Sequence, residues 1–184
     1  MSFKVPLGFS VAGVYCGIKE DTSKLDLSLI TSDRPTVAAG VYTQNRTLSP
    51  TVDSDREKTP FDDFRALVIN SGNANACTGE RGRQDVEQMA RLAADAVGAP
   101  AEGALVLSTG VIGVYMPMDK VALGIQAAAE KLNSDESALV AAASGILTTD
   151  SRHKLASREL TLGSKKVQIT GLAKGAAMIG PNMA

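Results

Sequence analysis

The sequence predicts an α/β protein with mixed sheets and packed helices. Two stretches, 65–97 and 104–132, each place a short apolar strand before a polar loop and an amphipathic helix. This order is typical of α/β proteins, which hold their sites in such loops. A chain of 184 residues is long enough to bury ~70% of its unfolded surface, so one domain over 1–184 is expected. Half of a larger, intertwined domain would show the same pattern.

Short antiparallel strands are expected before these two units, because their residues alternate or are β-branched. A turn at 32–35 separates the second strand from the third. In the second strand, leucines alternate with Asp26 and Ser28, which predicts one buried and one solvated face. Residues 47–63 hold two prolines and many charges and are expected to form a surface loop. The expected strands cover residues 8–16, 25–31 and 36–43.

The helices of the two units are indicated by apolar residues at helical spacing. Gly98 and Pro100 end the first helix. The second is expected over 117–132. The residues predicted to share the buried face of the first helix are Val86, Met89, Ala90, Ala93 and Val97.

A third helix and a hairpin complete the expected fold. The helix starts at Asn133 or Ser134, whose side chains can cap it, and it fades near Gly145. The hairpin pairs residues 157–162 with 166–172 around a Gly-Ser turn.

Composition and charge exclude several classes of function. Nineteen basic and twenty acidic residues leave a net charge of −1, so neither nucleic acid nor an anionic membrane is an expected partner. No apolar run reaches ~18 residues and no signal peptide is recognisable, which predicts a soluble cytoplasmic protein. Cys16 and Cys77 are expected to be free thiols in a reducing compartment. Since His153 is the single histidine, no metal site is expected.

Residues 108–110, Ser-Thr-Gly, form the first candidate site. A hydroxyl and a backbone N–H at the end of a buried strand are the donors that a tetrahedral oxyanion needs. An ordinary turn between a strand and a helix would have the same composition. The GxxxxGK[ST] pattern of phosphate-binding loops is absent.

Residues 70–79 form a second polar loop, with three asparagines, a serine, a threonine and two glycines. Such a loop is expected to be held by its own hydrogen bonds. Cys77 has no neighbouring histidine in sequence and is interpreted as a packing residue rather than a nucleophile.

Residues 148–151, Thr-Thr-Asp-Ser, are a third candidate loop, between the third helix and the hairpin. A plain connection with a charged, solvated tip is one interpretation. His153 lies between an arginine and a lysine, which predicts an exposed position rather than a role beside a nucleophile.

Lys174 is the one charge in the apolar stretch 167–184. A buried ammonium is costly without an anion, so Lys174 either reaches water or faces a negatively charged partner. The apolar residues that run to Ala184 suit a segment in a core or beside a site, and a cut end and a docked tail both fit them.

Three groups of residues resemble the bifunctional ornithine acetyltransferases of the cyclic arginine pathway, and the resemblance covers essentially all 184 residues. The groups are the Asn-Ala-Asn-Ala-Cys-Thr-Gly run at 73–79, the loop at 108–110, and Lys174, Gly175, Met178, Pro181, Met183 and Ala184.

The resemblance implies a fold of the self-processing N-terminal-threonine type. The precursor breaks itself between Ala184 and a threonine, so this chain would be the α chain. A separate β chain would carry the threonine nucleophile, typically in an α2β2 heterotetramer. The resemblance further implies that Thr109 and Gly110 form the oxyanion hole, and that Thr148, favoured over Thr149 by its spacing to the lysine, and Lys174 bind the substrate.

The implied activity moves the acetyl group of N-acetylornithine to glutamate through an acetyl-threonine ester, without a cofactor. Some family members also take the acetyl group from acetyl-CoA. The free amine of an N-terminal threonine, with a reference pKa of ~7.7–8.0, can act as the base for its own hydroxyl. Two other functions stay open: a self-processed threonine aminopeptidase or amidohydrolase, and a non-enzymatic small-molecule binding domain.

Overall fold

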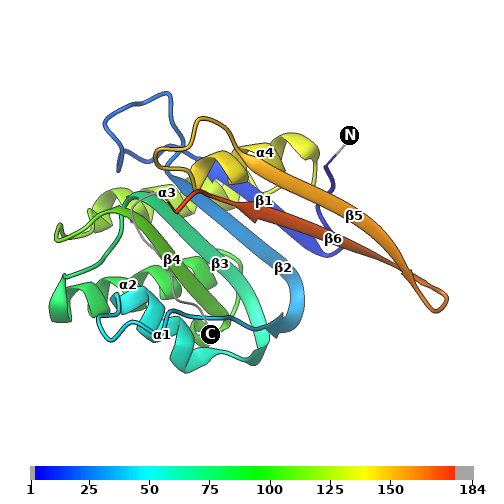
Figure 1. The fold of residues 1–184 in the computed structure, drawn as a ribbon, viewed down its shortest axis with the longest axis horizontal. Coiled ribbons are helices and arrows are strands. Elements are labelled where there is room, and N and C mark those ends of the chain that lie inside the picture. Colours follow the sequence, from blue (N-terminus) through cyan, green and yellow to red (C-terminus); the bar gives the residue numbers. More distant parts are fainter. Residues whose placement is uncertain (1–2, 177–184) are drawn as a thin grey trace.

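The computed structural model describes residues 3–176, which form a four-stranded sheet, a two-stranded hairpin and the helices packed on them (Figure 1). The strands of the larger sheet lie in chain order and are β1 (Phe9–Val14), β2 (Leu27–Ala38), β3 (Phe61–Asn73) and β4 (Ala104–Val111). β1, β2 and β3 pair antiparallel, whereas β3 and β4 pair parallel. The predicted α/β fold with a mixed sheet is confirmed.

Helices cover both faces of this sheet. They are α1 (Pro50–Lys58), α2 (Gly79–Asp95), the short 3-10 helix η1 (Ala101–Gly103), α3 (Met118–Glu130) and α4 (Glu136–Gly145). α2 and α3 pack on one face, and α4 packs on the opposite face over β1 and β2 (Figure 1). α2 is also the crossover that joins the parallel strands β3 and β4, as such strands require.

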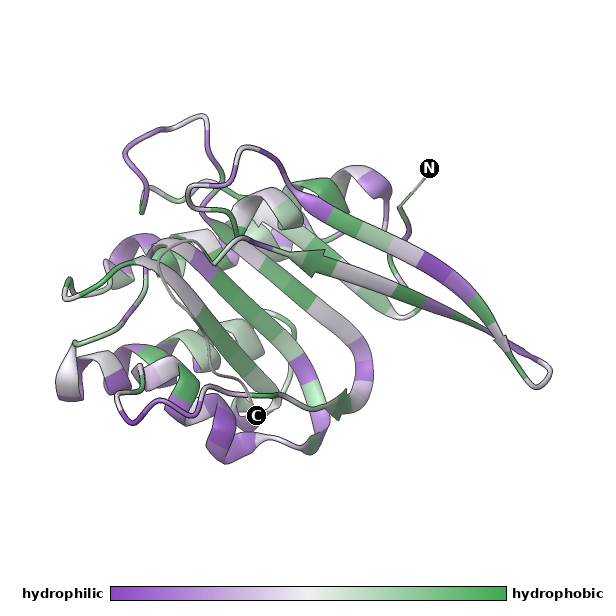
Figure 2. Cartoon of the chain, viewed as in Figure 1, coloured by the Kyte–Doolittle hydropathy of each residue, from purple (hydrophilic) through white to green (hydrophobic). Residues whose placement is uncertain are grey.

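The main core lies between the sheet and the helices α2 and α3. Leu27, Leu29 and Val68 from the strands meet Val86 and Met89 from α2 there, and all five are buried. Each such side chain contributes ~1.5–3 kcal/mol by leaving water. Figure 2 shows hydrophobic residues concentrated along β3 and β4, whereas α1 is mostly hydrophilic. The buried face predicted for the first helix is confirmed for Val86, Met89, Ala90 and Ala93, whereas Val97 lies just past the end of α2 and is partly buried.

The hairpin extends away from the rest of the molecule (Figure 1). It consists of β5 (Lys154–Leu162) and β6 (Lys165–Ala173). Leu155 and Leu172 pack at its base against the cluster formed with α4, whereas Leu162, farther out, is exposed. The predicted hairpin is therefore confirmed, with longer strands than expected.

The prediction that Asp26 and Ser28 face solvent is wrong, since both are 0% exposed. The carboxylate of Asp26 accepts hydrogen bonds from the backbone N–H groups of residues 16–19, at 2.7, 3.1, 2.8 and 3.0 Å. Ser28 Oγ donates to the carbonyl of Ala142 in α4 at 2.7 Å. The alternation of leucines is real, but a pattern within one strand does not reveal that a distant helix covers its polar face.

Three local boundaries also differ from the expectation. β2 continues through 32–35 with a register shift, so residues 36–43 form no separate strand. The expected loop at 47–63 contains α1, whose start is marked by the N-cap Ser49 and by Pro50. The cap of α4 is Asp135, which accepts a hydrogen bond from the N–H of Ala138.

The burial of Asp55 in α1 predicts that the stability of the folded protein depends on pH. Asp55 is 2% exposed, and burial raises its pKa from 3.8 to about 6, although the N–H of Val106 and the charge of Lys58 oppose the rise. The folded state therefore holds this proton more tightly than the unfolded state. The resulting stabilisation is present below about pH 4 and is lost as the pH rises through 6.

Replacement by asparagine (D55N) removes this titration and keeps an oxygen for Val106. Between pH 4 and pH 7 the unmodified full-length protein should lose about 2–3 kcal/mol of unfolding free energy relative to D55N. Denaturant unfolding of both proteins at the two pH values measures the difference. A difference that does not change with pH would show that Asp55 is not protonated in the folded state.

Candidate active site

The candidate site begins where the parallel strands β3 and β4 end. Residues 108–111 belong to β4 and are not the turn that was expected. Ser71 lies opposite Thr109 and Gly72 lies opposite Gly110 in the ladder. The pairing with β3 therefore sets the positions of Thr109, which is half-buried, and Gly110.

Gly110 and Gly72 touch through their backbones. Gly110 has φ +138°, and a Cβ there would lie 2.3 Å from the carbonyl carbon of Gly72. Gly72 has φ +110°, and a Cβ on it would lie 2.8 Å from Cγ2 of Ile18. Both positions therefore require glycine, and the backbone beside Thr109 carries no side chain that would obstruct a ligand. A hydroxyl and a backbone N–H in this setting can donate to a developing oxyanion.

The polar stretch at 70–79 is held by hydrogen bonds within itself, as predicted, and also by bonds to the segment after β4. Asn73 Nδ2 donates to the carbonyl oxygens of Val114 and Tyr115 at 3.0 and 3.2 Å. Asn75 and Thr78, both buried, bond to each other at 2.7 Å. These asparagines hold the segment after β4 and the first turn of α2, which places the end of β4 against the end of β3.

The two cysteines are free thiols that differ in burial. Burial, followed by the charge of Asp26, raises the pKa of the Cys16 thiol to about 12, so it stays protonated. Cys77 is exposed, at a positive φ of 58°, so the interpretation of Cys77 as a packing residue is wrong. His153 is half-buried, so its predicted exposed position is not what the structure has.

The end of α4 is fixed beside the end of β3. Ser71 Oγ donates to the carbonyl of Gly145 at 2.6 Å, and Lys19 Nζ donates to the carbonyl of Leu147 at 2.7 Å. The next residue, Thr148, is half-buried, whereas Thr149 is exposed. Ser71 therefore joins β3 to the last residue of α4, and Lys19 holds the residue that precedes Thr148.

Asp150 connects this loop to Lys174. Its side chain is 4% exposed, and its Oδ1 accepts a hydrogen bond from the N–H of Gly175 at 2.7 Å and an ion pair from Lys154. The hydrogen bond from Lys154, the N–H of Gly175 and the charge of Lys174 lower the pKa of Asp150. Lys174 is half-buried, and its ammonium donates to the carbonyl of Gly175 at 2.7 Å. Thr148 and Lys174 therefore belong to one connected group, through an aspartate for which no role was predicted.

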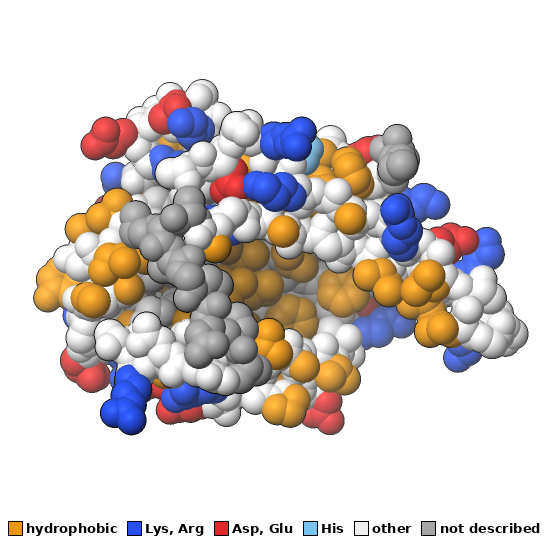
Figure 3. All heavy atoms as spheres, in the orientation of Figure 1, with side chains coloured by type: hydrophobic (Ala, Val, Ile, Leu, Met, Phe, Trp, Pro, Cys, Tyr) orange, Lys and Arg blue, Asp and Glu red, His pale blue; other side chains and the backbone are white. Residues whose placement is uncertain are grey.

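A hollow lies in front of the sheet on the face opposite α2 and α3, and hydrophobic side chains line it (Figure 3). Leu107 of β4, on the same side of the strand as Thr109, is 44% exposed. Ala184 lies outside the described residues, 3–176, as do Met178, Pro181 and Met183.

Within the described part of the chain, no three His, Cys, Asp or Glu side chains gather in a way that suits a metal ion. None of the helices in residues 3–176 has the length and apolar character that crossing a bilayer requires.

Comparison with known proteins shows the family to which this chain belongs. The model of the ArgJ family matches residues 10–184. The chain belongs to the ArgJ family. The resemblance to bifunctional ornithine acetyltransferases is thereby confirmed.

Relatives in the ArgJ family match this chain along its whole length. The arginine biosynthesis bifunctional protein ArgJ of Rhodopirellula baltica is 46% identical over 183 residues, covering 100% of this chain and 44% of its own length. The protein of that name from Thermotoga neapolitana is 45% identical, with 98% and 45% covered. The mitochondrial ArgJ of Yarrowia lipolytica is 40% identical, with 97% and 43% covered. The chain thus spans less than half the length of these curated relatives.

Solved ArgJ structures have the same fold. The ArgJ structure from Bacillus halodurans has a TM-score of 0.89 at 35% identity and is covered over 95% of its chain. Ornithine acetyltransferase from Mycobacterium tuberculosis, solved in complex with ornithine, has a TM-score of 0.90 at 34% identity and is covered over 96% of its chain. The expected fold, of the type found in ornithine acetyltransferases, is confirmed.

The contact of Gly110 with Gly72 can be tested with two alanine variants of the full-length protein. Gly113 also has a positive φ, +81°, but a Cβ there meets nothing within 4 Å. G113A should therefore cost only the ~1–2 kcal/mol of a left-handed backbone conformation. G110A should cost clearly more, because the backbone of β3 must move as well. Equal unfolding free energies for the two variants would contradict the close contact.

Proposed function

We propose that this chain is the α chain of a self-cleaving N-acetyltransferase that moves the acetyl group of N-acetylornithine to glutamate. The observation that carries the proposal is membership of the ArgJ family along the whole chain. The contacts at the ends of β3 and β4 support it, since they connect the strand of Thr109 and Gly110 to the loop of Thr148 and, through Asp150, to Lys174.

The proposed precursor is cut after Ala184, and the threonine that follows heads the β chain. The lengths of the relatives support this proposal. The chain covers 44% of the curated Rhodopirellula protein but 95% of the chain in the Bacillus structure. The crystallised Bacillus polypeptide is therefore about as long as this chain. This is expected if the precursors of the family are cut near the position of Ala184.

The proposed chemistry starts from the hydroxyl of that threonine, whose own α-amine takes the proton. The oxygen attacks the acetyl carbon of N-acetylornithine, and the tetrahedral oxyanion receives hydrogen bonds from Thr109 Oγ1 and the N–H of Gly110. Collapse breaks the amide bond, and the α-amine returns its proton to the departing ornithine nitrogen. The amine of glutamate then attacks the acetyl-threonine ester, and the α-amine of the threonine takes a proton from it. The ester C–O bond breaks, the α-amine returns this proton to the threonine oxygen, and N-acetylglutamate leaves.

Lys174 and Thr148 are proposed to bind the amino-acid part of the substrates. N-acetylornithine and glutamate both carry an α-carboxylate, which an ammonium can pair with. Asp150 supports the proposed role of Lys174, because its carboxylate holds the backbone N–H of the neighbouring Gly175. No cofactor is required, and acetyl-CoA is an alternative acetyl donor.

The proposed assembly is an α2β2 heterotetramer located in the cytoplasm. The hydrophobic hollow in front of the sheet suits coverage by the β chain, because an exposed apolar surface of this kind marks a contact with another polypeptide (Figure 3). Neither nucleic acid nor a membrane is a proposed partner.

Release of ornithine from N-acetylornithine by the full-length protein tests the proposed reaction. The release should require glutamate and should show ping-pong kinetics. Release without glutamate would indicate an amidohydrolase or aminopeptidase instead. An uncut protein that binds N-acetylornithine without turnover would indicate a binding domain.

Thr109 should lower the activation barrier of both precursor cleavage and acetyl transfer. Its replacement by alanine (T109A) should slow cleavage of the precursor and kcat by about 10² to 10³, the effect of removing one oxyanion donor. T109S is the matched control, because it keeps the hydroxyl and should retain most of the activity. Cleavage and turnover at normal rates in T109A would refute the role of this side chain.

Lys174 should act on binding rather than on the chemical step. In K174M the KM for N-acetylornithine should rise about tenfold or more, since a charge-assisted hydrogen bond is worth ~1.5–3 kcal/mol. K165M, on the exposed end of the hairpin, should leave KM unchanged. An unaltered KM in K174M, measured by initial rates, would mean that Lys174 does not contact the substrate.

A further inference from the structure

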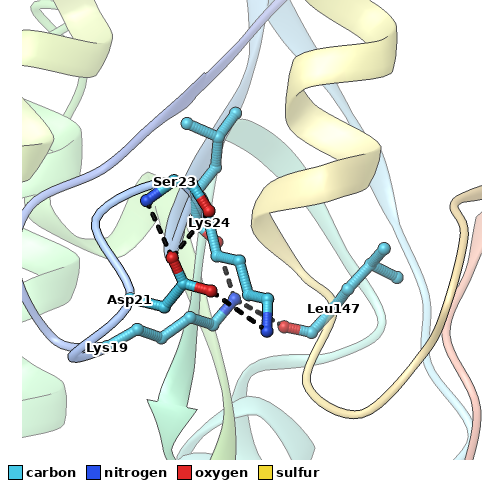
Figure 4. A network of polar contacts seen from close by, with 6 residues as sticks. Lys19, Asp21, Ser23, Lys24 and Leu147 are labelled. Atoms are coloured by element: carbon cyan, nitrogen blue, oxygen red, sulfur yellow. Dashed lines mark hydrogen bonds and ion pairs between the residues drawn. The ribbon is translucent and has the colours of Figure 1, made fainter.

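Lys19 is a partly buried cation whose side chain spans two segments of the chain (Figure 4). Its ammonium donates to the carbonyl of Leu25 at 2.6 Å and to the carbonyl of Leu147 at 2.7 Å. Leu25 precedes β2, whereas Leu147 follows α4, so the two acceptors are far apart in sequence. One side chain thus joins the start of β2 to the segment that leads into Thr148.

The groups around Lys19 favour a single, fixed position of its ammonium. Burial lowers the pKa of its ammonium, and the nearby charge of Asp26 opposes this effect. The backbone N–H of Lys19 also donates to Oδ2 of Asp26 at 3.0 Å. Leu147 O lies just beyond the end of α4, where a cation is favourable because the last helical carbonyls carry partial negative charge.

The stem of Lys19 contacts the other part of the site. A Cβ on Gly72 would lie 3.2 Å from Cγ of Lys19, so this stem packs over the backbone of Gly72. Gly72 in turn is opposite Gly110 in the ladder and touches it. The stem therefore packs against the strand next to Thr109 and Gly110, while the ammonium holds the loop of Thr148.

We propose that Lys19 is a positioning residue of the acetyl-transfer site: it holds Leu147, and with it Thr148, at a fixed distance from the Gly72–Gly110 contact. This inference rests on the proposed function. Lys19 needs no contact with the substrate, because both of its acceptors are backbone carbonyls of this chain. Loss of the ammonium would free the loop of Thr148, whereas the ladder that holds Thr109 and Gly110 would remain.

Replacement of Lys19 by methionine (K19M) in the full-length protein tests the proposal. The KM for N-acetylornithine should rise about tenfold, as expected when a charge-assisted hydrogen bond is lost, and kcat should change less than KM. K19R should recover part of the affinity, because guanidinium keeps the charge and the donors. The matched control is K24M, which removes an exposed ion pair with Asp21 from the same loop and should change neither constant (Figure 4).

Amide hydrogen exchange supplies a second readout that does not depend on turnover. K19M should speed exchange at residues 146–150 and leave β3 and β4 protected, while K24M should match the unmodified protein. If K19M is not recovered in folded form, K19Q replaces it; because Gln keeps a neutral donor, the same changes in KM and exchange are expected with a smaller size.

The outcomes separate the two proposals. If the unmodified protein transfers acetyl groups and K19M shows a normal KM or unchanged exchange at 146–150, Lys19 is not a positioning residue. A fall in thermal stability with KM unchanged would likewise reduce Lys19 to a structural role. If the unmodified protein moves no acetyl group from N-acetylornithine, the proposed function fails, and the role of Lys19 in it fails as well.

Discussion

The buried carboxylate of Asp26 is the interaction on which the geometry of the site depends. A carboxylate that is fully removed from water is costly unless donors replace the water. Here four consecutive backbone N–H groups, from residues 16–19, do so. The backbone of Asp26 also bonds to Val14 and Ser71, so this one residue holds together β1, β2 and the end of β3.

The other contacts of the candidate site depend on the segment that Asp26 holds in place. The segment wrapped around Asp26 places Ile18 and the stem of Lys19 against Gly72, and the parallel ladder places Gly72 against Gly110. Ser71 and Lys19 then fix the carbonyls that precede Thr148. The site is thus built from backbone contacts at the ends of two strands, which suits an oxyanion hole, because its donors must not move as charge develops.

The sequence predicted the parts of this arrangement that depend on local pattern. The helical spacing of residues such as Val86 and Met89 predicted α2 and its buried face, and the Ser-Thr-Gly run marked the end of β4 at which the candidate site lies. The alternation around Asp26 and Ser28 misled, because it contains no information about the partners of these side chains, which are the backbone of residues 16–19 for Asp26 and α4 for Ser28. No role was predicted for Lys19 or Asp150 from the sequence, because each contacts a partner more than twenty residues away in the chain. Gly72 and Gly110 were visible as glycines, but their contact depends on the register of the parallel ladder.

We propose that a threonine follows Ala184 and heads a second polypeptide, and that these strand ends serve it. Incubation of the full-length protein with N-acetylornithine in the absence of glutamate tests it most directly, with the acetylated residue mapped by peptide mass spectrometry. We expect one acetyl group, on the N-terminal threonine of the companion polypeptide, and we expect added glutamate to remove it. An acetyl group on a residue of this chain, or a companion polypeptide that begins with another residue, would contradict it.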